Sequence, residues 1–131
     1  MRKALVLTLL CSALSCSGNP SAPKHGGPLA DGNWSGGGAC LAVADTCNMI
    51  AGCGHGVFPR PTIRDDGTFD VDGTYRIEVG PVSIDPAPPA HFSGSISGST
   101  LTLTVVPSGS IAKGTYTMQA AAAANCGIRC V

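Results

Sequence analysis

The sequence predicts an all-β fold: a small antiparallel meander sheet, curled or closed into a barrel of six to eight strands. Several short segments alternate apolar and polar residues, as half-buried strands do. Turn-forming residues separate these segments roughly every 8–12 residues, a spacing typical of β-sandwiches and barrels. The 131-residue chain is also rich in Gly (18) and Pro (10) and low in charge (12%), which suits strands and turns better than long helices.

Four segments in the second half of the chain carry the clearest strand pattern. Their apolar positions alternate with Thr, Ser, Arg or Glu, so one face of each strand is expected to be buried. Ser97-Gly98-Ser99 separates two of them and predicts a hairpin turn, because Gly adopts the positive φ that such turns need. The segments are 74–79, 91–97, 100–106 and 113–119, and the expected core residues in them are Tyr75, Ile77, Phe92, Ile96, Leu101, Leu103 and Val105.

Other parts of the chain carry weaker patterns. Asp66-Gly67 and Asp72-Gly73 predict turns, and so do the neighbouring acidic residues, because Asp-Gly is a common turn pair. The Ala-rich stretch 120–124 is too short for a stable helix, so we expect a loop or a single turn there. The weaker strand candidates are 34–43, 62–64, 68–71 and 82–84.

Residues 1–15 predict a signal peptide. Met1-Arg2-Lys3 is basic, and the apolar run 4–14 is too short to span a bilayer, which needs roughly 20 residues. The following Ala13-Leu14-Ser15-Cys16 resembles the lipobox of bacterial lipoproteins, although that family usually has a larger aliphatic residue where Ala13 stands. The resemblance implies cleavage before Cys16 and lipidation of this cysteine with diacylglycerol and palmitate. Plain secretion after an ordinary signal-peptidase cut is the alternative.

The segment after Cys16 predicts a flexible tether. Residues 17–30 contain three Pro and three Gly and almost no large apolar side chain, so they bury too little surface to offset their ordering entropy. The expected organisation is therefore a tether at 16–30 and a barrel-like domain at 31–131. Ser17, rather than Asp, follows the cysteine, and in the lipoprotein family this implies an outer-membrane location in the cell envelope.

Two stretches of the domain resemble lipocalins. Gly32-Asn33-Trp34 is similar to the Gly-x-Trp that opens that family, and 92–103 resembles the hairpins of small lipocalin-like envelope lipoproteins. The resemblance implies an up-and-down barrel. Apart from it, we expect Trp34 to close one end of the core, because aromatic side chains usually contribute buried area. The domain is short and has no Thr-Asp-Tyr element, so ligand binding inside the barrel does not follow from this resemblance.

The cysteines predict disulfides. An exported domain enters an oxidising compartment, where nearby cysteine pairs are joined. Since five cysteines remain after Cys16, at least one is left over, and we expect two bridges, at least one of them linking the 40–53 region to the C-terminal pair. A local Cys47–Cys53 bridge is also natural. The candidates are Cys40, Cys47, Cys53, Cys126 and Cys130.

A metal or redox site is the alternative for part of this set. Cys47, Cys53 and His55 place two thiols and an imidazole in what the sequence presents as one Gly-rich loop. Their spacing departs from the Cys-x2–4-Cys pair of most structural zinc sites. Disulfides are therefore the first expectation, and metal binding or thiol redox chemistry through these three residues is the second.

Composition and motifs narrow the function classes. The full chain has no net formal charge, and removal of Arg2 and Lys3 leaves six basic against eight acidic residues, a net charge of −2, which disfavours nucleic acid. Neither a Gly-x-Ser-x-Gly nucleophile motif nor a phosphate-binding loop occurs, so we expect no enzyme and no cofactor. We expect a lipid-anchored envelope module, non-catalytic and acting by binding or structure, whose partner is the membrane through Cys16. A protein or a small apolar ligand is left open.

Overall fold

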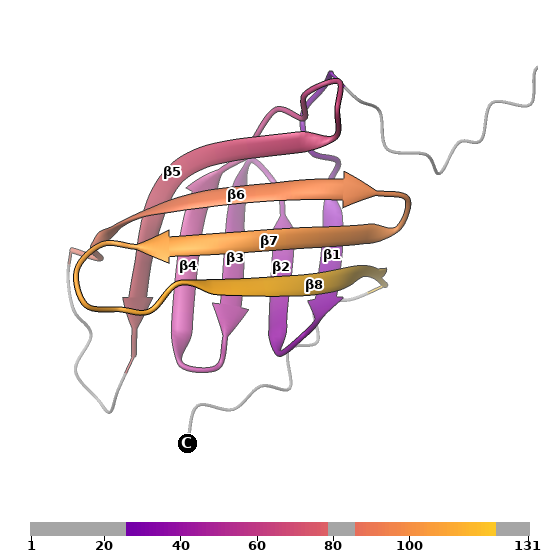
Figure 1. The fold of residues 1–131 in the computed structure, drawn as a ribbon. Helices are drawn as coiled ribbons and strands as arrows, with labels where there is room; N and C mark the ends of the chain where they lie inside the picture. The colour runs from indigo at the N-terminus through magenta and orange to yellow at the C-terminus, as the bar shows by residue number, and fades with distance from the viewer. Residues whose placement is uncertain (1–25, 79–85, 123–131) are drawn as a thin grey trace, which may run out of the picture.

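The protein is an eight-stranded antiparallel barrel, described here by a computed structural model over residues 26–78 and 86–122 (Figure 1). Each strand pairs with the next, and β8 closes the barrel on β1. The described residues contain no helix, and so none that is long and apolar enough to cross a membrane. The strands are β1 (Gly32–Gly36), β2 (Ala39–Val43), β3 (Thr46–Ala51), β4 (Gly54–Pro59), β5 (Thr68–Ile77), β6 (Pro89–Ser97), β7 (Thr100–Pro107) and β8 (Gly114–Ala121).

The barrel has two crossing walls. In Figure 1, β1 to β4 run behind β6 to β8, and β5 bends from one wall into the other. Gly73 lies near this bend, at the point where pairing with β4 gives way to pairing with β6 alone. A Cβ at Gly73 would lie 2.7 Å from the Cβ of Phe58, so the two walls approach too closely there for any side chain. Asp72 and Gly73 both lie within β5, so the turn predicted at this pair is wrong.

The later strands match the prediction closely, and the hairpin turn at Gly98 has the expected positive φ of 60°. β8 continues to Ala121, so the loop or turn expected from residue 120 is wrong at its start. The earlier part differs. The candidate strand 34–43 is two strands, β1 and β2, because Gly37 and Gly38 adopt φ values of 60° and 82° and reverse the chain. Cys47 to Cys53, expected in a loop, forms most of β3 and the turn after it.

The barrel interior is filled with apolar side chains. Six of the seven predicted core residues are buried, and Ile77 is half-buried against the same cluster. Phe58 and Phe92 stack at the centre with ring centroids 4.4 Å apart. Trp34, expected to close one end of the core, is partly buried and packs against it. The largest fully buried side chains are Phe58, Phe69, Phe92, Leu41, Met49, Ile63, Leu101, Leu103, Met118, Val105 and Cys47.

The segment before β1 packs on the loop between β4 and β5. The Gly26 and Leu29 amides donate to the carbonyls of Ile63 and Pro61, and the Leu29 and Ile63 side chains are both buried. The end of the expected tether is thus part of the domain. The candidate strand at 62–64 reduces to one isolated bridge, Pro28 to Thr62.

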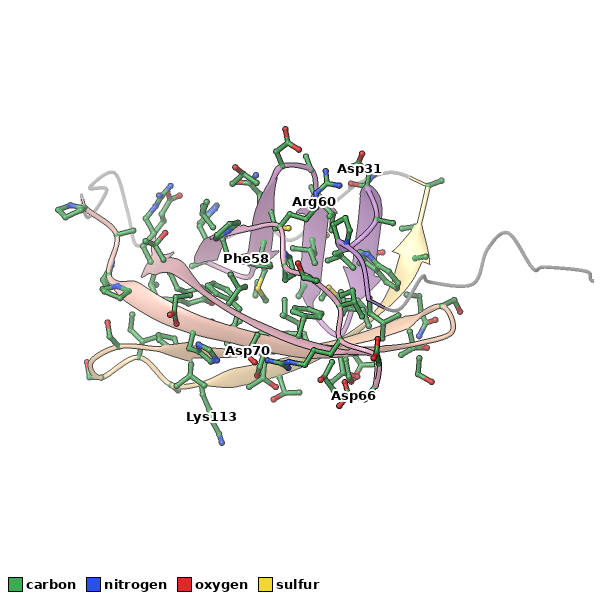
Figure 2. The ribbon with its side chains drawn as sticks, turned by 90° about the horizontal axis from the view of Figure 1, so that it is seen from above. Asp31, Phe58, Arg60, Asp66, Asp70 and Lys113 are labelled. Carbon is green, nitrogen blue, oxygen red and sulfur yellow. The ribbon has the colours of Figure 1, made fainter. Side chains whose placement is uncertain are left out.

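Arg60 closes the same end of the barrel (Figure 2). Its guanidinium pairs with Asp31, lies 3.4 Å from Asp45 and donates to the Ala44 carbonyl at 2.9 Å. It joins the start of β1 to the turn between β2 and β3. Residues 1–25, 79–85 and 123–131 lie outside the described part, and with them lie the predicted signal peptide, Cys16, the candidate strand 82–84, Cys126 and Cys130.

Candidate functional site

A groove of about 320 Å³ lies on the outer wall of the barrel, over β5, β6 and β7. It is shallow and largely open to solvent. The interior is occupied by the core, so the groove is the candidate site. Its lining residues are Arg64, Thr68, Phe69, Asp70, Ser93, Gly94, Ser95, Thr102 and Thr104.

Strand alternation places hydroxyl groups in the groove. Phe69, Leu103 and Val105 face the core and are buried, so their sequence neighbours face outward. The register then aligns these outward residues across three strands. One row is Asp70, Ser93 and Thr104, and the next is Thr68, Ser95 and Thr102. Short hydroxyl side chains therefore form a small regular array on the groove floor.

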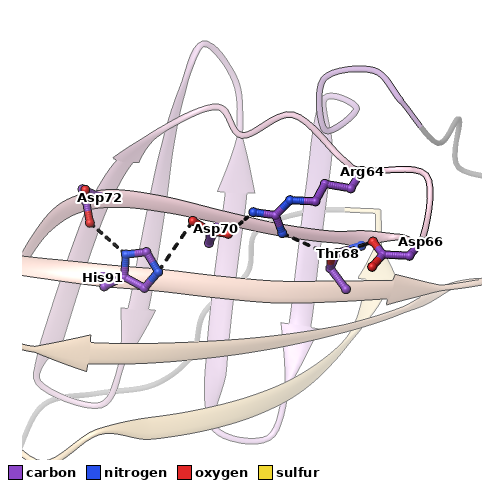
Figure 3. Close-up of polar contacts among 6 residues, drawn as sticks. All are labelled: Arg64, Asp66, Thr68, Asp70, Asp72 and His91. Atoms are coloured by element: carbon purple, nitrogen blue, oxygen red, sulfur yellow. Dashed lines mark hydrogen bonds and ion pairs between the residues drawn. The ribbon is translucent and has the colours of Figure 1, made fainter.

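Arg64 lies in the loop before β5 and contacts one edge of this array (Figure 3). Its guanidinium pairs with Asp70 and donates to the Thr68 hydroxyl at 3.2 Å. The hydrogen bond from Arg64 holds the pKa of Asp70 below its usual value. Asp66 accepts from the Thr68 hydroxyl at 2.6 Å and from its amide at 3.0 Å, which lowers the pKa of Asp66. Both carboxylates are therefore ionised at neutral pH.

His91 extends the network along β5 and β6. Its Nδ1 lies 2.8 Å from Asp72 Oδ1, and its Nε2 lies 3.8 Å from Asp70 Oδ1 (Figure 3). Asp72 and His91 are directly opposite in the strand register, so the sheet itself brings them together. The acidic residues expected in turns are thus divided: Asp66 is in a turn, whereas Asp70 and Asp72 are outward residues of a strand.

The residues of the alternative metal or redox site are not brought together. Cys47 is near the start of β3 and buried in the core, whereas Cys53 is in the turn beyond the other end of that strand. His55 is on β4, with its Nε2 3.2 Å from Glu78 Oε2. Within residues 26–78 and 86–122, no three His, Cys, Asp or Glu side chains are placed to hold a metal ion.

The fold places the described cysteines in different environments. Cys47 is a free thiol, and burial raises its pKa to about 11, so it does not form the expected local bridge with Cys53. Cys40 and Cys53 each take part in a disulfide bond. No disulfide joins two residues of the described part of the chain.

Part of the groove could be predicted from the sequence. The outward phase of 91–97 and 100–106 already placed Ser93, Ser95, Thr102 and Thr104 on one side of their strands. The register between these strands and the return of Arg64 onto Asp70 had no local signature. No protein-family model, no curated protein and no solved structure matches this chain.

Proposed function

We propose that this chain is an exported cell-envelope protein, anchored by lipid on Cys16, that acts by binding or structure rather than by catalysis and uses the outer groove as its binding surface. The observation that carries the proposal is the contrast between a filled interior and a polar outer wall. A ligand inside the barrel would have to displace stacked aromatic rings such as Phe58 and Phe92. The groove is accessible without any such change.

The outer wall favours a polar ligand over the small apolar ligand left open by the sequence. The side chains that line the groove from outside the core carry hydroxyl, carboxylate or guanidinium groups. Among the described residues, Val106 is the only large hydrophobic side chain that is exposed. A surface of this kind offers little to lipid chains, so membrane contact is assigned to the lipid on Cys16.

The anchor is supported by the order of leader, small residue and cysteine at 1–16. Ser17 directs the proposed location to the outer membrane. A Cys16→Ser variant should be released from the membrane into the soluble envelope fraction. The matched control is Cys11→Ser, the same change inside the leader, which cleavage removes; this variant should stay with the membrane. Native protein found in the soluble fraction, with an unmodified N-terminus by mass spectrometry, would overturn the anchor.

The groove has a separate test. Backbone amides of the 31–131 domain are followed by NMR while a mixed panel of sugars, amines, carboxylic acids and short peptides is added. Shifts that cluster at Ser93, Ser95, Thr102 and Thr104 would support a binding surface here. Shifts confined to β1–β4, or to residues of the core, would reject the groove as the site.

A further inference from the structure

We propose that the groove binds a neutral oligosaccharide. This inference rests on the proposed function, because it names the ligand of the same groove. It begins from the arrangement of the floor, where Ser93 and Ser95 on β6 are each directly opposite a Thr of β7. Four hydroxyl groups from two adjacent strands thus face the same space, and that of Thr104 is already hydrogen-bonded to the Thr115 hydroxyl at 3.0 Å.

The groups in the groove match the chemistry of a sugar. Each Ser or Thr hydroxyl both donates and accepts a hydrogen bond, as each hydroxyl of a sugar does. Asp70 adds an acceptor and Arg64 adds directional donors at one edge. Since Arg64 and Asp70 neutralise each other, the lining carries no net charge. A ligand that is polar and uncharged therefore finds partners without leaving a buried charge unpaired.

The surroundings disfavour an anion. Asp65 and Asp66 lie in the loop beside the groove, and Asp72 continues the outward face of β5 beyond Asp70. The basic residues nearby are Arg64, which is already paired with Asp70, and His91, which lies between Asp70 and Asp72. A phosphate or sulfate entering the groove would meet like charge.

The floor is also preorganised. Ser and Thr have short side chains that lose little rotamer freedom on binding, and here they are fixed on hydrogen-bonded strands. The ring of Phe69 lines the groove only from below and is buried, so hydrogen bonds rather than aromatic stacking would hold the sugar.

The test is an NMR titration of the 31–131 domain with two soluble probes, maltotetraose and chitotetraose, and with inorganic phosphate as the anionic arm. At least one oligosaccharide should shift the amides of Ser93, Ser95, Thr102 and Thr104 in a saturable way, and phosphate should not. Thr102→Val removes one hydroxyl from the floor with little change of shape and should weaken binding by about 2- to 10-fold. The matched control is Thr117→Val, because Thr117 is the cross-strand neighbour of Thr102 but does not line the groove.

Each outcome separates the two proposals. Saturable groove shifts with an oligosaccharide, weakened by Thr102→Val and kept in Thr117→Val, support the saccharide site. If neither oligosaccharide shifts the groove while an amine, acid or peptide of the mixed panel does, the saccharide inference is wrong and the groove stands. Equal weakening by both variants would overturn the assignment of Thr102. Shifts with phosphate alone would reverse the charge argument.

Discussion

The ring of Phe69 on β5 lies against Gly94 on β6, and the two residues are directly opposite in the strand register. A Cβ added at Gly94 would lie 2.5 Å from this ring, inside van der Waals contact. Gly94 is therefore an inward position of the barrel that carries no side chain because a neighbouring ring fills its space. Gly56 on β4 is similar, since a Cβ there would lie 2.9 Å from the ring of Phe92.

Gly94→Ala should therefore destabilise the barrel. Overpacking a filled core typically costs about 1–3 kcal/mol, because the ring must leave its rotamer or the strands must shift. The free energy of unfolding measured in urea should fall by about that amount. Gly27→Ala is the control, since a Cβ there meets no atom within 4 Å and the backbone φ is ordinary. Equal effects of the two changes would show that the contact with Phe69 does not matter.

Leu103→Ala tests the interior from the opposite direction. Leu103 is fully buried at the middle of β7, and truncation of such a leucine costs about 2–5 kcal/mol through lost burial and the cavity left behind. Val106→Ala on the same strand is the comparison, because Val106 is 44% exposed and should change stability by less than about 0.5 kcal/mol. Thermal and urea unfolding measure both. A near-neutral Leu103→Ala would mean that the inward phase of β7 is misassigned.

These glycines also explain what the sequence could not predict. The later strands show their phase because Leu, Val, Phe and Ile alternate with Ser and Thr, and period-two alternation identifies a half-buried strand. β4 presents Gly54 and Gly56 at inward positions, so its core face carries no apolar residue there. The side chains that fill those positions, Tyr75 and Phe92, belong to other strands. A pattern read along one segment cannot contain them.

The groove was likewise only partly predictable from the sequence. Outward Ser and Thr residues are visible in each strand, but their alignment depends on the register set by long-range pairing. The pairing of Arg64 with Asp70 depends on how the loop after β4 returns to β5. Cys47 and Cys53, close in sequence, are separated because an extended strand carries them to its two ends.

Cys47 supplies a prediction about pH. Burial raises the pKa of its thiol from 9.0 to about 11, so the folded state favours the protonated form. Its contribution to the free energy of unfolding is fully present below pH 9 and is lost as the pH rises from 9 to 11. The loss amounts to at most about 3 kcal/mol above that range. The urea midpoint should therefore fall across this window. Tyr75, whose burial raises its pKa to about 12, adds to the fall only above pH 10.

The control for this prediction is Cys47→Ala. It lowers stability at every pH by removing buried volume, but it should abolish the decline between pH 9 and 10. In the native state at mildly alkaline pH, Cys47 should also fail to react with an aromatic disulfide reagent, because the thiol is buried and protonated. It should react once urea unfolds the chain. Rapid reaction of the folded protein would contradict its place in the core.

The disulfides give the last prediction. Cys40 and Cys53 each take part in a disulfide and Cys47 is free, so we expect the partners to be Cys126 and Cys130, the cysteines left once the leader is removed and Cys16 carries lipid. β8 ends at Ala121, opposite Asn33 of β1, which pairs with β2. Cys40 is near the start of β2 and faces outward, because Ala39 and Leu41 on either side face the core, yet it is only 5% exposed. Cys53 lies beyond it, in the turn after β3.

In the strand register, Cys40 lies nearer than Cys53 to Ala121, the last residue of β8. Five residues reach at most about 17–18 Å, so we expect Cys126 to bond with Cys40, and Cys130, four residues further, to bond with Cys53. Proteolysis without reduction, followed by mass spectrometry, should recover these two linked peptides, with Cys47 alone alkylated after unfolding. Cys126→Ser should lower the free energy of unfolding by up to about 4–5 kcal/mol, because the bridge to Cys40 closes a long loop at the β1–β8 seam. Recovery of a Cys126–Cys130 peptide, or of any bridge that contains Cys47, would refute the pairing.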